Sequence, residues 1–161
     1  MIFVDSNIPM YLMGAAHPHK TESQVILERL IAAGERLVTD AEVLQEILHR
    51  YTAIDRREAI GPAIQVTLDI VDEVIPVGKA EVLRAGEIAQ SRLSMSARDA
   101  VHIAIMERHG IRSIFSFVSG SIAGRLARAS RSARRTHSPT VRRSRLAKRW
   151  MSNISGSGSN T

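Results

Sequence analysis

The stretch Ile2-Phe3-Val4-Asp5, close to the start of the chain, decides the fold class. Three apolar residues in a row that end in an acid are typical of a strand buried on both faces, as strands of a parallel sheet are. Parallel strands need long connections, which are usually helices. Beyond Asp5, helical patterns alternate with short apolar runs. The sequence therefore predicts an α/β fold with a mainly parallel central sheet flanked by helices.

The expected elements alternate along the first 117 residues. One of the expected helices, residues 56–72, contains Gly61-Pro62, which indicates a break or a kink. We expect strands at residues 1–5, 36–38, 73–77 and 112–117, and helices at residues 21–33, 40–53, 56–72, 79–91 and 97–109.

Charge divides the chain into two parts. Residues 1–117 carry all 16 acids and 12 of the 22 Lys and Arg, a net charge of −4, whereas residues 118–161 carry 10 basic residues and no acid. We expect the first part to be one folded domain. The second part is rich in Ser, Arg and Gly, and we expect it to be a largely disordered basic tail.

Several classes of protein are excluded by what the sequence lacks. Without cysteine there is no disulfide scaffold and no thiol catalysis. No G-x-x-x-x-G-K-[ST], G-x-G-x-x-G or G-x-S-x-G motif occurs, which removes support for phosphate-cradling loops and for serine hydrolysis. No apolar run is long enough to span a membrane, and the first residues do not resemble a signal peptide. The expected location is the cytoplasm.

Asp5 is the first candidate for a functional acid. It ends a predicted strand at the carboxyl edge of the sheet, where ligands bind in folds of this kind. A desolvated carboxylate is costly there unless a cation pairs with it, and Mg²⁺ would be a suitable partner. The alternative is that Asp5 caps the next helix, a role for which Ser6 and Asn7 also compete. The residues alone leave both interpretations open.

Two more acids have two interpretations each. Asp99 follows Ser96 in an S-x-x-D pattern, so it either belongs to a capping box or lies at a helix N-terminus that faces the same crevice. Glu46 either pairs with Arg50 on a solvated helix face or lies at the mouth of the sheet. The histidines, His102 among them, show no metal-binding spacing, and we expect them to be structural or on the surface.

Three stretches, taken together in their order, resemble the motifs of a known family. Ile2–Asn7 resembles an apolar first strand that runs into D-[TS]-N. Val43–Tyr51 resembles a second acidic motif with Glu46 as its carboxylate, and Ser96–Ala104 resembles a third in which Asp99 opens a helix. This pattern is that of PIN-domain ribonucleases of the bacterial VapC toxin family, and the resemblance covers nearly all of the acidic part.

The resemblance implies a PIN-like three-layer fold and an enzyme that cleaves RNA by metal-activated water. It implies that Asp5, Glu46 and Asp99 are catalytic. Asp5 and Asp99 are expected to contact Mg²⁺, or alternatively Mn²⁺, with Glu46 beside them as a ligand or through a water. It also implies the toxin role in a type II toxin–antitoxin system, with a cognate VapB-type antitoxin and a homodimer.

The sequence departs from this family at residue 118. Members usually place a fourth acid there, after the last strand, but this chain has Val118. One hypothesis is that the chain from about this residue is read out of frame; a gene in which no shifted frame restores a D-x-G-like ending would contradict it. The alternative is a genuine basic extension that binds the RNA backbone. We expect reduced but not absent metal-dependent activity. The alternative function is a catalytically impaired PIN-domain protein that retains antitoxin and RNA binding.

Two further function classes fit the sequence less well. A phosphotransfer enzyme with a nucleophilic Asp5 would need a second acid two residues on, where Asn7 stands. A plain basic nucleic-acid-binding protein would depend on the tail alone, so that a fragment of residues 1–117 would lose all binding.

Overall fold

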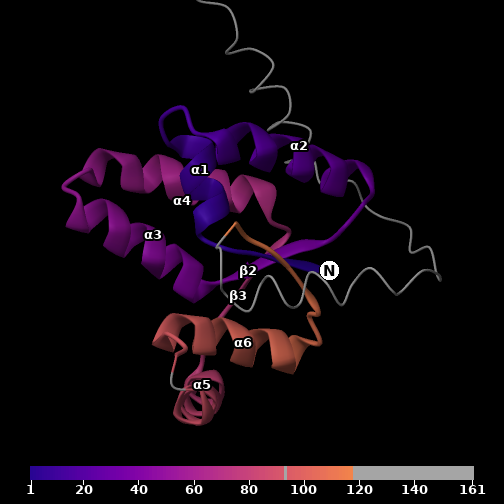
Figure 1. Cartoon of the computed structure of the whole chain (residues 1–161), viewed down its shortest axis with the longest axis vertical. Helices are drawn as coiled ribbons and strands as arrows, with labels where there is room; N and C mark the ends of the chain where they lie inside the picture. Colours follow the sequence, from indigo (N-terminus) through magenta and orange to yellow (C-terminus); the bar gives the residue numbers. More distant parts are fainter. Residues whose placement is uncertain (93, 118–161) are drawn as a thin grey trace, which may run out of the picture.

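A four-stranded parallel sheet lies at the centre of the computed structural model, which describes residues 1–92 and 94–117 (Figure 1). The strand order is β3-β2-β1-β4, and Phe3 of β1 pairs with Val38 on one side and Ile114 on the other. The predicted α/β fold is confirmed. Val118 and the expected basic tail lie outside the described residues. The strands are β1 (Ile2–Val4), β2 (Leu37–Asp40), β3 (Glu73–Ile75) and β4 (Ser113–Phe115).

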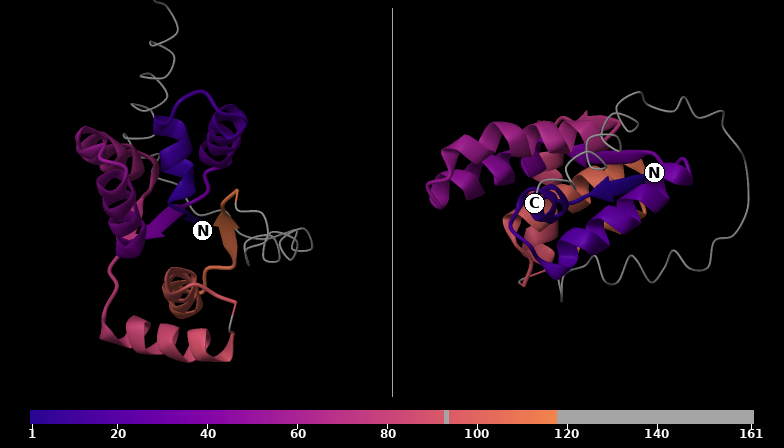
Figure 2. Two further views of the ribbon diagram at one scale, coloured as in Figure 1. Left: turned by 60° about the vertical axis from the view of Figure 1, so that its left-hand side comes forward. Right: turned by 90° about the horizontal axis from the view of Figure 1, so that it is seen from above.

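Helices cover both faces of the sheet. They are α1 (Asn7–Met13), α2 (Pro18–Ala32), α3 (Ala41–Ala53), the short 3-10 helix η1 (Arg57–Ala59), α4 (Ile60–Ile70), α5 (Lys79–Ser91) and α6 (Ala97–His109). Figures 1 and 2 show α1, α2 and α4 on one side of the sheet and α6 on the other, with α5 packed outside α6. Among the described residues, no helix is both long and apolar enough to cross a membrane.

The apolar run that predicted β1 is buried because both of its faces are covered. Side chains alternate along a strand, so neighbouring residues pack into different layers. Phe3 joins a cluster that includes Ile105 of α6, whereas Val4 packs with Ile8 and Leu27 of the opposite helical layer. All five side chains are fully buried.

Helix α1 was not expected from the sequence, and α2 begins three residues before the expected start at residue 21. Two further expected elements differ in their boundaries. The expected strand at residues 36–38 continues to Asp40, which then caps α3 by accepting a hydrogen bond from the Val43 N–H at 3.0 Å. The expected helix at 56–72 is divided into η1 and α4, and the division falls before Gly61-Pro62. The two residues lie in the first turn of α4, where a proline needs no intrahelical N–H partner.

Two adjacent residues of α3 test this packing. Ile47 is fully buried beside the sheet, whereas the side chain of Leu48 is 48% exposed. Ile47→Ala should lower the free energy of unfolding by about 2–5 kcal/mol, because it removes apolar contacts and leaves a cavity. Leu48→Ala should change it by no more than about 0.5 kcal/mol. Urea unfolding of both variants measures the difference, and equal losses would contradict the packing described.

Candidate active site

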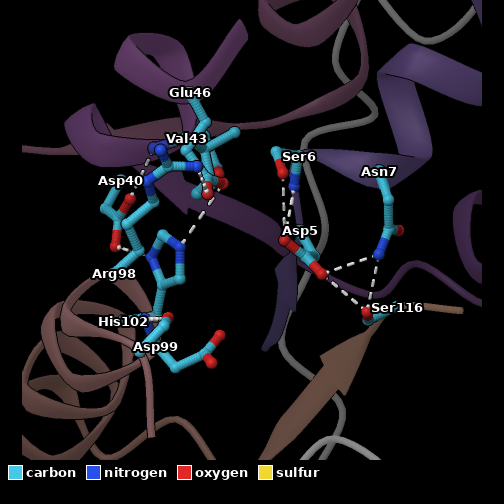
Figure 3. Close-up of polar contacts among 12 residues, drawn as sticks. Asp5, Ser6, Asn7, Asp40, Val43, Glu46, Arg98, Asp99, His102 and Ser116 are labelled. Atoms are coloured by element: carbon cyan, nitrogen blue, oxygen red, sulfur yellow. Dashed lines mark hydrogen bonds and ion pairs between the residues drawn. The ribbon is translucent and has the colours of Figure 1, made fainter. Parts of the chain in front are cut away.

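Three neighbouring strands bring polar side chains to one edge of the sheet. Asp5 follows β1, Asp40 ends β2 and Ser116 follows β4, and β1 lies between the other two strands. Because all strands are parallel, these are the carboxyl ends, where α/β sheets bind ligands. The first turns of α6 and one face of α3 complete the site (Figure 3).

The Asp5 carboxylate is held in one orientation by three neighbours. Its Oδ1 accepts a hydrogen bond from the Ser6 N–H at 2.7 Å, and its Oδ2 accepts from the Asn7 amide at 2.8 Å and the Ser116 hydroxyl at 2.6 Å. The N-cap residue of α1 is Ser6, so Asp5 lies one residue before the cap position, and its carboxylate accepts the Ser6 N–H at the start of the helix. Burial raises the pKa of the Asp5 carboxyl, and the hydrogen bond from Ser116 opposes this only in part.

Glu46 reaches the same edge from α3. Its Oε1 accepts a hydrogen bond from Arg98 Nη1 at 3.0 Å, and its Oε2 lies 3.7 Å from Nε2 of His102. The ion-pair partners of Glu46 are therefore these two residues of α6. One interpretation of the sequence paired Glu46 with Arg50, and that interpretation is wrong. Burial alone would raise the pKa of Glu46, but hydrogen bonds from His102, Ser6 and Arg98 outweigh it and lower the pKa to about 2.

A buried ion pair links His102 to Asp40. Nδ1 of His102 lies 2.8 Å from Oδ2 of Asp40, and both side chains are almost fully buried. Burial disfavours a charge on the imidazole, but hydrogen bonds to Asp40 and Glu46 prevail and raise the pKa of His102 to about 10. With a carboxylate at each ring nitrogen, His102 is an imidazolium at neutral pH.

A divalent cation would fit the donors gathered here. Asp5, Glu46 and His102 each offer a ligand atom, and these atoms lie within 4.8 Å of one another. Carboxylate oxygens are the ligands that Mg²⁺ and Mn²⁺ prefer. An imidazolium has no free lone pair, so the acids would hold the cation while His102 balances their charge.

Asp99 lies outside this close group. It is exposed in the first turn of α6, one turn before His102, and its N–H donates to the Ser96 hydroxyl at 3.1 Å. The capping role of Ser96 is thus present. In Figure 3 the Asp99 carboxylate points away from Arg98, toward the side on which Asp5 and Ser116 lie. A metal-binding role for Asp99 stays a prediction.

Three residues that shape the site were not predicted from the sequence. His102 was expected to be structural or on the surface, although its position three residues after Asp99 places both on one helix face. Asp40 was assigned to the start of a helix, and its pairing with His102 spans 62 residues of sequence. Ser116 was part of a strand. The one feature of the sequence that could have identified Ser116 as a site residue was a hydroxyl side chain at the carboxyl end of that strand, where the crevice was expected.

Comparisons with known proteins show the family to which the chain belongs. A family model described as the PIN domain matches residues 2–117. The chain therefore belongs to the PIN-domain family, which confirms the predicted three-layer fold.

Its relatives define the subgroup. VapC ribonuclease Mb1869c of Mycobacterium bovis and ribonuclease VapC13 of Mycobacterium tuberculosis are each 56% identical over 120 residues, which cover 74% of this chain and 92% of the relative. Ribonuclease VapC23 of Mycobacterium tuberculosis is 34% identical over 117 residues, 73% of this chain and 92% of its own length. Within its family the chain is thus one of the VapC ribonucleases of toxin–antitoxin systems, as its motifs predicted.

A solved structure supports the fold alone. The crystal structure of VapC20 of Mycobacterium tuberculosis, described as a sarcin-ricin loop cleaving toxin, superposes with a TM-score of 0.61 at 23% identity. The match covers 80% of this chain and 95% of that one.

The His102 pair predicts how stability depends on pH. The pKa of His102 is raised from 6.5 to about 10 on folding, so its contribution is fully present below about pH 6.5 and is lost as pH rises through about 10. The free energy of unfolding, measured with urea in EDTA, should therefore fall over this range in the wild type and fall less in His102→Gln. His109→Gln, at the exposed end of α6, should behave like the wild type. Parallel curves for all three proteins would rule out a charged His102.

Proposed function

We propose that this chain is a Mg²⁺-dependent endoribonuclease toxin in which Asp5 and Asp99 contact the metal and Glu46 lies beside them. The observation that carries the proposal is the convergence of Asp5 from β1 and Glu46 from α3 on one point. When bound, the cation would lower the pKa of a water molecule and neutralise charge on the scissile phosphate. Mn²⁺ would serve the same acids.

The chain's own residues prepare this site. Ser6, Asn7 and Ser116 hold Asp5 in one orientation, so its carboxylate needs no reordering when a cation arrives. The low pKa of Glu46 keeps it ionised at neutral pH, as either a ligand or an acceptor that orients water requires. Arg98 is half-exposed beside Glu46, where a guanidinium can contact an RNA phosphate.

Substitution of the acids tests the proposal. Asp5→Asn and Asp99→Asn in the full chain should each abolish cleavage of total RNA in Mg²⁺, and Glu46→Gln should reduce it, because each loses a negative charge at the metal. Calorimetric titration with Mn²⁺ should show weakened binding in the same variants. Glu28→Gln, on the exposed side of α2, is the matched control and should retain both properties.

The outcomes of this assay separate the alternatives. Cleavage that persists in Asp5→Asn would refute the assigned role, and RNA binding that ignores both Mg²⁺ and Asp5→Asn would favour a non-catalytic protein. Val118→Asp should increase Mn²⁺ affinity and cleavage, because it supplies the fourth acid that the family usually has. An unchanged Val118→Asp variant would show that the missing acid does not limit activity.

The partners belong to the same proposal. VapC toxins pair with VapB antitoxins and act on RNA, and we propose a cognate VapB-type antitoxin, a homodimer and a cytoplasmic location for this chain. Light scattering of the purified chain should give twice the monomer mass of 17.7 kDa. A monomeric mass at micromolar concentration would contradict the dimer.

Co-expression with the antitoxin encoded beside it should give a larger complex that does not cleave RNA.

A further inference from the structure

Aromatic rings gather at one corner beside the active site. The chain has only three Phe, two Tyr and one Trp, yet Tyr11 and Phe117 meet here with His17 and His19. The rings of Tyr11 and His17 are stacked with centroids 4.9 Å apart, and those of His19 and Phe117 are stacked at 4.5 Å. An edge contact of 6.0 Å between Tyr11 and Phe117 joins the two stacks. We call these four residues the ring corner.

The ring corner is built on the elements that hold the catalytic acid. Asn7 and Tyr11 lie one turn apart on α1, a rise of about 6 Å along the helix axis. Asn7 donates to Ser116 at 2.9 Å, and Tyr11 contacts Phe117, the next residue of the chain. A ligand on the ring corner would therefore lie about one helical turn from the groups that orient Asp5.

His17, one of the four rings, also lines an open hollow of about 560 Å³. It is lined by Ala16, His17, Pro18, Lys20, Thr21 and Gln24, none of which is an acid. Lys20 adds a positive charge, and its Nζ donates to the Gly14 carbonyl at 3.0 Å. Glu22, the acid nearest in sequence, does not line the hollow, and its Oε2 lies 3.2 Å from Nδ1 of His19. The lining of the hollow thus contains one positive charge, the ring of His17 and no acid, which would suit an anionic ligand with a planar group.

Packing alone does not account for this arrangement. Phe115 is buried in the core, and Phe117 packs against it, so the end of β4 is anchored without His17. His17 is exposed, although it stacks on Tyr11, and its Nδ1 caps α2 by accepting a hydrogen bond from the His19 N–H at 3.1 Å. An exposed imidazole gains little from the removal of apolar surface from water. The cap and the stack on Tyr11 fix the plane of the imidazole, which leaves a preorganised stacking surface exposed.

We propose that the ring corner and its hollow bind a nucleotide of single-stranded RNA next to the scissile phosphate. A base stacks on the rings around His17, and Lys20 contacts the backbone. Proteins bind unpaired bases on aromatic and histidine side chains in this way, whereas duplex RNA keeps its bases stacked on one another. The inference rests on the proposed RNA-cleaving function and names a subsite outside the acids that define it.

Anisotropy of a short fluorescein-labelled single-stranded RNA tests the subsite. The full chain carries Asp5→Asn in every protein, so that the RNA stays intact. In this background His17→Ala should weaken binding by at least about fivefold, the effect expected from one lost base stack. His17→Trp should restore binding, because it replaces the stacking plane. His109→Ala, a histidine at the far end of α6, should leave the affinity unchanged.

Two further measurements separate stacking from charge. An abasic oligonucleotide of the same length offers no base to stack. It should therefore bind the Asp5→Asn parent and its three histidine variants with equal affinity. Lys20→Gln should reduce the slope of log affinity against log salt by about one, and His17→Ala should leave this slope unaltered. The basic tail is common to every variant, so its binding cancels in the comparison.

Equal RNA affinity of the His17→Ala and His109→Ala proteins would overturn the subsite, provided that thermal unfolding shows both to be folded. An equal loss on the intact and abasic oligonucleotides would also overturn it, because His17 would then act through charge. Neither result bears on the loss of cleavage that is predicted for the acid substitutions. If Asp5→Asn instead leaves cleavage intact, the assigned role of Asp5 fails, and the affinities measured in EDTA, which withholds the cation and keeps the RNA whole, still test the subsite.

Discussion

The buried ion pair between Asp40 and His102 is the interaction on which the rest of the site depends. Asp40 ends β2, caps α3 through its other oxygen and binds an imidazole of α6, so one carboxylate joins three elements. Burying two charges is costly, and breaking such a pair costs several kcal/mol because it leaves one charge uncompensated. The helices that carry Glu46 and Asp99 are consequently fixed relative to the sheet by this contact.

The same pair sets the electrostatics of the site. His102 and Arg98 compensate Asp40 and Glu46, and the pKa of Glu46 is low as a result. Among the residues that the structure describes, Asp5 receives hydrogen bonds but no ion pair, and burial raises its pKa. Like charges held close together disfavour further ionisation unless a cation intervenes. The cations His102 and Arg98 therefore leave the buried carboxylate of Asp5 without an ion-pair partner among the described residues, and an external metal ion would be a suitable one.

Local patterns predicted the parts of this structure that depend on local physics. The apolar run before Asp5 predicted a strand covered on both faces, and Ser96 followed by an apolar helix predicted the start of α6. Motif resemblance selected Asp5, Glu46 and Asp99 without any knowledge of their distances. The pairing of Asp40 with His102 could not be predicted in this way. It joins residues 62 positions apart, and neither residue lies in a pattern that sets it apart from an ordinary cap or core histidine.

Helix α1 connects the two halves of the proposed mechanism. One of its faces carries both Asn7, which orients Asp5, and Tyr11, which supports the ring corner. Recognition of a base and placement of the catalytic acid would then share one rigid element, so that a bound nucleotide is positioned relative to the metal ligands. Stacking tolerates every base, since each has a π-face. Any preference for one base must come from hydrogen-bonding groups around it, and Thr21 and Gln24 line the hollow where such contacts would form.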